Sequence, residues 1–109
     1  MYTNKEALNI LDADKKTEAI LHIVENLLFV NRPDYEYLDD VKAEDYIAVK
    51  DWVNTFDFQF LSLEETVDAI MDVVSSLMEE HAGFVYNEES ENLDRKDVTA
   101  WLNQPAVMG

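Results

Sequence analysis

The chain of 109 residues contains no cysteine, which excludes a disulfide framework, a thiolate metal site and a cysteine nucleophile. It has only two glycines and two prolines, so the composition favours helices joined by few sharp turns. No apolar run approaches the ~18 residues that a membrane span requires. The polar N-terminus, residues 1–16, lacks a secretory hydrophobic region. We therefore expect a cytoplasmic protein that does not contact a membrane.

Basic residues are also scarce. The chain has 24 acidic and 8 basic residues, a formal net charge of -16, and no lysine or arginine occurs from Asp51 through Asp94. Such a surface repels nucleic acid and anionic membranes, and it attracts basic surfaces. We expect no direct nucleic-acid binding, and a basic protein as the partner.

The apolar content is high enough to form a core: 48% of the residues are hydrophobic and 11% are aromatic. The length fits one acidic helical domain over residues 1–109. No internal repeat or low-complexity linker is apparent.

Capping boxes and apolar periodicity predict the helices. Thr3 and Glu6 form one capping box, and Ser62 and Glu65 form another. Gly83 provides a stop signal for the most clearly periodic helix. The expected helices are Asn4–Leu11, one begun by Asp12 or Asp14 and reaching about Phe29, Ala43–Asn54, Ser62–His81, and about Leu93–Asn103.

Other segments carry weaker signals. Phe56–Phe60 alternates aromatic and polar residues and predicts a strand, which pairs with a second short strand at Phe84–Tyr86. Asp34–Asp40 is expected to be a loop or a single turn, and Asn87–Asn92 an acidic loop. The predicted fold is all-α, or mainly α with a short strand pair, in a compact bundle of four to five helices.

Catalytic patterns are weak. No serine has a glycine-flanked elbow, and the two glycines cannot build a phosphate-binding loop. Glu18, His22 and Glu25 share one helix face, for which a solvated surface is favoured over a metal site. We expect no catalytic, cofactor-binding or metal-binding residue, and no enzymatic activity.

One enzyme family offers an alternative. Glu64-Glu65-Thr66-Val67-Asp68 and Glu91-Asn92-Leu93-Asp94 resemble the paired acidic motifs of all-α nucleotide pyrophosphohydrolases of the MazG type. The resemblance covers these two short segments. It implies carboxylates that gather Mg²⁺ over a nucleoside triphosphate. The last acid of the first motif is Asp68 where the family has glutamate.

The acidic surface itself predicts function. Asp68 and Asp72 lie one helical turn apart, about 6 Å along the axis, which is of the same order as the phosphate spacing in nucleic acid. The charge and size are similar to those of small phage inhibitors, including anti-restriction and anti-CRISPR proteins. We expect an inhibitor that mimics DNA or RNA on the basic surface of a nucleic-acid-binding protein. The expected partner-binding residues are Asp34, Glu36, Asp39, Asp40, Glu44, Asp45, Glu64, Glu65, Asp68, Asp72, Glu79, Glu80, Glu88, Glu89 and Glu91.

Mimicry also predicts exposed aromatic anchors, with Tyr35, Tyr37 and Tyr86 as candidates and Phe58 favoured for the core. The other alternative is a phage assembly, adaptor or regulatory protein that acts through an apolar surface. That surface would use Met71 and Met78, or the Phe56–Phe60 segment. The oligomeric state, monomer or homodimer, separates the two ideas, because the net charge opposes self-association unless apolar surface drives it.

Overall fold

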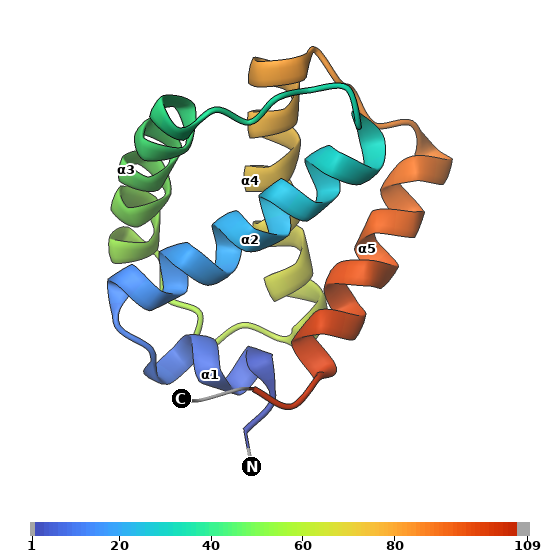
Figure 1. Cartoon of the computed structure of the whole chain (residues 1–109). Helices are drawn as coiled ribbons and strands as arrows, with labels where there is room; N and C mark the ends of the chain where they lie inside the picture. The colour runs from blue at the N-terminus through green and yellow to red at the C-terminus, as the bar shows by residue number, and fades with distance from the viewer. Residues whose placement is uncertain (1, 107–109) are drawn as a thin grey trace.

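The computed structural model describes residues 2–106, and in that range the secondary structure consists of helices. They are α1 (Asn4–Ile10), α2 (Ala13–Asn31), α3 (Asp39–Thr55), α4 (Leu63–Ala82) and α5 (Glu88–Asn103) (Figure 1). The predicted all-α bundle is confirmed. Within residues 2–106 no helix is long and apolar enough to cross a membrane.

Side-chain caps begin four of the helices. Thr3, Ser62 and Asn87 each form a capping box at the start of α1, α4 and α5, and the Asp12 side chain accepts a hydrogen bond from the backbone N–H of Lys15. Gly83 ends α4 in the left-handed conformation, with φ 64°, which a residue without Cβ adopts at little cost. The predicted capping boxes at Thr3 and Ser62 are therefore confirmed.

The predicted strand pair is wrong: the bridge recorded within residues 2–106 joins Thr3 to Pro105. Between α3 and α4 the chain makes tight turns. The Asp57 carboxylate accepts a hydrogen bond from the backbone N–H of Gln59, and the N–H of Leu61 donates to the carbonyl of Phe58. Phe58 is buried because its ring packs against two other aromatic rings, not because it lies on one face of a strand.

Two helices begin earlier than the sequence pattern predicts. α5 begins at Glu88, so the expected acidic loop at Asn87–Asn92 is wrong; the amide of Asn87 accepts from the N–H of Ser90 and starts the helix. α3 begins at Asp39 rather than Ala43. Both first turns are acidic, and carboxylates there interact favourably with the helix dipole.

The molecule contains an internal repeat that the sequence analysis missed. The first hairpin, α2–α3, and the second hairpin, α4–α5, have the same plan. A tyrosine precedes the second helix of each hairpin: Tyr37 in the first and Tyr86 in the second. Its hydroxyl donates a hydrogen bond to an aspartate eight residues later, Asp45 or Asp94. Each such helix buries three residues in the same order: Asp45, Val49 and Val53 in α3, and Asp94, Val98 and Leu102 in α5.

The first helices of the two hairpins match as well. In α2 the side chains of Ile20, Val24, Leu27 and Leu28 are buried, and Ile70, Val74, Leu77 and Met78 occupy the matched positions of α4. Ile20, Val24 and Leu27 are identical to their matched residues, whereas most exposed positions differ and the connecting segments, 32–38 and 83–87, are of unequal length. The sequence signal for the repeat is the spacing of Tyr, Asp, Val and Trp at positions 37, 45, 49 and 52, which recurs at 86, 94, 98 and 101.

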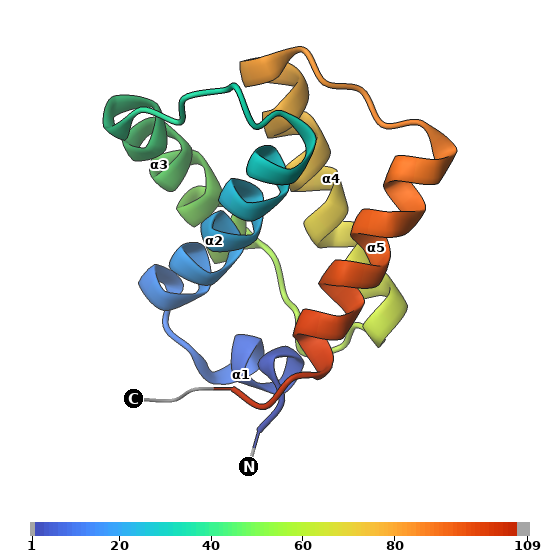
Figure 2. The ribbon, with the colours of Figure 1, turned by 45° about the vertical axis from the view of Figure 1, so that its right-hand side comes forward.

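The two hairpins are arranged around an approximate two-fold axis. α2 and α4 cross at the centre, while α3 and α5 flank them on opposite sides (Figures 1 and 2). A half-turn about the vertical axis of Figure 1 exchanges the hairpins. The connecting segments 32–38 and 83–87 therefore come to the same end, which we call the loop end. α1 lies at the opposite end, where the backbone N–H of Asn4 donates to the carbonyl of Gln104.

Candidate functional site

Almost all of the carboxylates lie on the surface. Of the 24 acidic residues, 22 are exposed, and the other two are Asp45 and Asp94. Within residues 2–106 three exposed carboxylates form ion pairs: Asp14 with Lys50, Glu25 with Lys42, and Asp68 with Arg95. Most of the negative charge therefore faces solvent without a basic partner in the described part of the chain.

The fold gathers most of the expected partner-binding residues at the loop end. They come from both hairpins, because α2 and α4 end there and α3 and α5 begin there (Figures 1 and 2). Between residues 2 and 106, none of these acids has an ion-pair partner. The group consists of Asp34, Glu36, Asp39, Asp40, Glu44, Glu79, Glu80, Glu88, Glu89 and Glu91, all exposed.

The remaining expected acids lie elsewhere. Glu64 and Glu65 stand at the start of α4, away from the loop end, and Asp68 and Asp72 follow on the same helix. The backbone N–H of Ser62 donates to Glu65, which lowers the pKa of that carboxyl. Arg95 approaches Asp68 with 2.6 Å between Nη2 and Oδ1. These residues form a second acidic region beside α3 and α5.

Asp45 is not a surface residue. Its exposed fraction is 4%, and its carboxylate accepts the hydroxyl of Tyr37. The Nε2 atom of His81 lies 2.9 and 2.8 Å from the two carboxylate oxygens. The expected surface position of Asp45 is therefore corrected: its partners enclose it between α3 and the end of α4. The helical period of α3 turns Asp45 to the same side as Val49, which the sequence pattern could have indicated.

Asp94 is the matched residue of the second hairpin and is also enclosed. Its carboxylate accepts hydrogen bonds from the Tyr86 hydroxyl at 2.5 Å and from Nδ2 of Asn31 at 2.8 Å. Asn31 and His81 are themselves matched: Asn31 is the last residue of α2, and His81 is the last but one of α4. Each aspartate thus binds the tyrosine of its own hairpin and the helix end of the other hairpin.

This arrangement bears on the acidic motifs that resemble pyrophosphohydrolases. Asp94 is enclosed, while Glu64, Glu65 and Glu91 are exposed. Within residues 2–106 no three acidic or histidine side chains are placed to hold a metal ion. Pyrophosphohydrolase activity stays a prediction, which Mg²⁺-dependent release of pyrophosphate from nucleoside triphosphates would test.

The expected aromatic anchors are only partly accessible. Tyr35, Tyr37 and Tyr86 are half-buried and pack against the core, and Phe58 is buried, as favoured. Burial and the hydrogen bonds to Asp45 and Asp94 raise the pKa of Tyr37 and Tyr86. These two hydroxyls are therefore engaged within the protein.

The expected methionine surface is wrong, because Met71 and Met78 are buried in the core. In the other expected segment, Phe56–Phe60, Phe58 is buried but Phe60 is exposed to 81%. Phe29 and Val30, near the end of α2, are also exposed, with fractions of 72% and 62%. At the matched positions α4 carries Glu79 and Glu80. Phe29 and Val30 continue the apolar run of Leu27 and Leu28 in α2, so the sequence pattern alone does not distinguish them as exposed.

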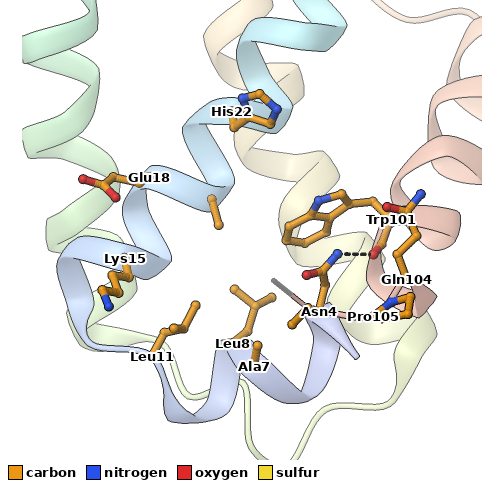
Figure 3. Close-up of a pocket in the computed structure, with 12 residues that line it drawn as sticks. Asn4, Ala7, Leu8, Leu11, Lys15, Glu18, His22, Trp101, Gln104 and Pro105 are labelled. Carbon is orange, nitrogen blue, oxygen red and sulfur yellow. Dashed lines mark hydrogen bonds between the residues drawn. The ribbon is translucent and has the colours of Figure 1, made fainter. Parts of the chain in front are cut away.

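A pocket of about 750 Å³ lies between α1, α2 and the end of α5. Figure 3 shows the Trp101 indole projecting into the space between α1 and α2, and the Asn4 amide donating to the Trp101 carbonyl. Lys15, Glu18 and His22 form its polar side.

A smaller pocket, of about 310 Å³, occupies the matched place beside α3 and α4. Trp52 takes the position of Trp101, and three carboxylates face it in place of the mixed polar side: Glu65, Asp68 and Asp72. The two pockets thus share a tryptophan wall and differ in charge.

Comparison of the chain with protein-family models, with curated proteins and with solved structures finds no match.

Proposed function

We propose that this chain is an inhibitor that occupies the basic nucleic-acid-binding surface of a partner protein, in the manner of a DNA or RNA mimic. The observation that carries the proposal is the loop end, where carboxylates of both hairpins are exposed and without ion pairs in residues 2–106. A helical framework presents charges at fixed positions. A basic cleft is attracted to such an array as it is to phosphates.

The approximate two-fold axis supports the proposal. It places two acidic helix starts, Asp39-Asp40 of α3 and Glu88-Glu89 of α5, on one end of the molecule. Duplex nucleic acid likewise presents two negatively charged strands to a protein. Arg32 also lies at the loop end, over the Phe84 ring, but it forms no ion pair with these acids in residues 2–106. Solubility alone explains exposed acids, but it does not require that ten of them gather at one end without an ion pair in that range.

The test is a pull-down from cell lysate with the tagged full chain, eluted in parallel with salt and with excess duplex DNA. A nucleic-acid-binding protein that elutes with both supports the proposal. A partner that resists salt and DNA, or capture of the chain by itself alone, would contradict it.

A matched pair of variants makes the experiment specific. The first replaces Asp40, Glu80 and Glu89 at the loop end by their amides, and the control does the same for Glu18, Asp51 and Asp97. All six residues are exposed, and the net charge changes equally. We expect the loop-end variant to weaken capture roughly tenfold, since each exposed charge pair contributes ~0.2–1 kcal/mol. Equal losses of capture in both variants would mean that binding depends on net charge and not on the position of the loop-end acids.

A second candidate function, an adaptor that binds through apolar surface, is favoured by the exposed Phe29 and Val30. Large exposed aromatic residues are frequent binding anchors. If this candidate function is correct, a partner protein or a second copy of the chain should remain bound to the chain in high salt.

A further inference from the structure

The pocket beside α3 and α4 has an aromatic wall. The rings of Trp52 and Phe56 stack, with centroids 4.8 Å apart and planes inclined by 25°. Both rings line the pocket, and three carboxylates complete it: Glu65, Asp68 and Asp72. Flat aromatic surface next to carboxylates attracts a cation in two ways, through the ring quadrupole and through charge.

The matched pocket in the other half of the molecule provides an internal comparison. It keeps the tryptophan wall with Trp101, but Lys15 stands in place of Glu65 and His22 in place of Asp72. The aromatic frame is therefore common to both halves. Three carboxylates line the pocket beside α3 and α4, whereas the other pocket has one, Glu18, together with Lys15. A cation would be attracted to one pocket and opposed by Lys15 at the other.

One carboxylate of the pocket already binds a guanidinium group within the protein. Asp68 accepts from Nη2 of Arg95 at 2.6 Å, and Arg95 lines a neighbouring hollow with Asp68 and Asp72. Asp72 lies one turn further along α4, is exposed, and has no ion-pair partner in the part of the chain that the structure describes. Asp72 is thus the carboxylate available to a group that enters the pocket.

We propose that this pocket binds an arginine side chain of a basic partner, with the guanidinium plane on the Trp52 ring and its N–H groups donating to Asp72. Arginine suits the pocket better than lysine, because its planar group stacks on aromatic rings and donates to a carboxylate through two N–H groups. The inference rests on the proposed function, since it gives the second acidic region, away from the loop end, a contact with the same basic partner.

The test uses the ¹⁵N-labelled full chain and N-acetyl-arginine methylamide as the probe. The two tryptophan indole N–H signals report on the two matched pockets in one NMR titration, after assignment with Trp101→Phe. We expect the Trp52 signal to shift with increasing probe and the Trp101 signal to stay in place. N-acetyl-lysine methylamide should bind several-fold more weakly.

Two variants with the same change of charge on the same helix complete the test. Asp72→Asn should weaken probe binding roughly two- to fivefold, the range expected for one exposed ion pair. Glu79→Gln, at the loop end of α4, should leave it unchanged. Both residues are exposed, so both variants keep the fold.

Several results would overturn the inference. They are equal shifts of the two indole signals, equal binding of the lysine probe, or equal binding by Asp72→Asn and the unmodified chain. The titration needs no partner protein, so its failure leaves the pull-down result standing. If the titration succeeds and the pull-down fails, the arginine-binding pocket is supported and the inhibitor function is contradicted.

Discussion

The two hairpins share the same buried positions and hydrogen bonds, which we call the shared frame, and differ in their exposed side chains. Each has eleven acidic residues, counted over 12–55 and 62–104, but the first has five lysines and arginines and the second has two. The tyrosine–aspartate pairs and the buried positions agree between them. The comparison separates residues that build the hairpin from residues that are free to serve a partner, and the second group includes most of the charge.

The shared frame fails most severely when an enclosed aspartate is removed. Asp45→Ala leaves His81 and the Tyr37 hydroxyl without their acceptor, and Asp94→Ala does the same to Asn31 and the Tyr86 hydroxyl. We expect each variant to lose about 3 kcal/mol of unfolding free energy, measured by urea denaturation followed by circular dichroism. A loss below about 1 kcal/mol in either would show that the two sites are not equivalent.

Alkaline pH should weaken the matched tyrosine–aspartate pairs of the two hairpins alike. The folded state raises the pKa of Tyr37 and Tyr86 above the usual ~10, through burial and the neighbouring carboxylates. Their contribution is therefore complete below pH ~10 and is lost as pH rises further, because the unfolded tyrosines ionise first.

Each tyrosine should make the unfolding free energy fall by about 1.4 kcal/mol per pH unit above pH ~10. Tyr37→Phe and Tyr86→Phe should each remove one such contribution from the slope. Denaturation curves between pH 8 and 11 check this, and an unchanged slope in either variant would contradict it.

The helix starts differ between the hairpins, and exchanging them sharpens the comparison. Leu38 precedes α3 without a side-chain cap, whereas Asn87 caps α5. Leu38→Asn should stabilise the protein by about 1 kcal/mol, and Asn87→Ala should destabilise it by a similar amount. Thermal unfolding would show midpoint shifts of about 4 °C in opposite directions. Shifts in the same direction would mean that the first turn of α3 does not use the new cap.

The smallest effect on stability is expected at the ends of α2 and α4. Phe29→Glu with Val30→Glu makes α2 resemble the matched end of α4, and exposed substitutions of this kind change stability by about 0.5 kcal/mol. The same variant should abolish any salt-resistant association in analytical ultracentrifugation or pull-down. Association that survives the change would exclude this pair as the adaptor surface.

Local signals predicted the helices well, since the caps at Thr3, Asp12 and Ser62 act within a few residues of sequence. The Phe56–Phe60 segment was misassigned because Phe56 and Phe58 form an aromatic cluster with Trp52, a tertiary contact, while Phe60 is exposed. Asp45 was assigned to the surface from its residue type, although His81, its partner, lies 36 residues away in the chain. The repeat was missed because its identical residues, such as Tyr37 and Tyr86 or Asp45 and Asp94, are scattered at helical spacing among exposed positions that mostly differ.

The crosswise bonds of the two aspartates have a kinetic consequence. Tyr37 and Tyr86 lie eight residues from their acceptors, but His81 is 36 residues from Asp45 and Asn31 is 63 from Asp94. Each hairpin can form from local contacts, and such contacts form quickly. The hydrogen bonds between the hairpins form only when the hairpins meet. Docking of preformed hairpins should then limit the folding rate. Separately expressed halves of the chain would complete one another on mixing.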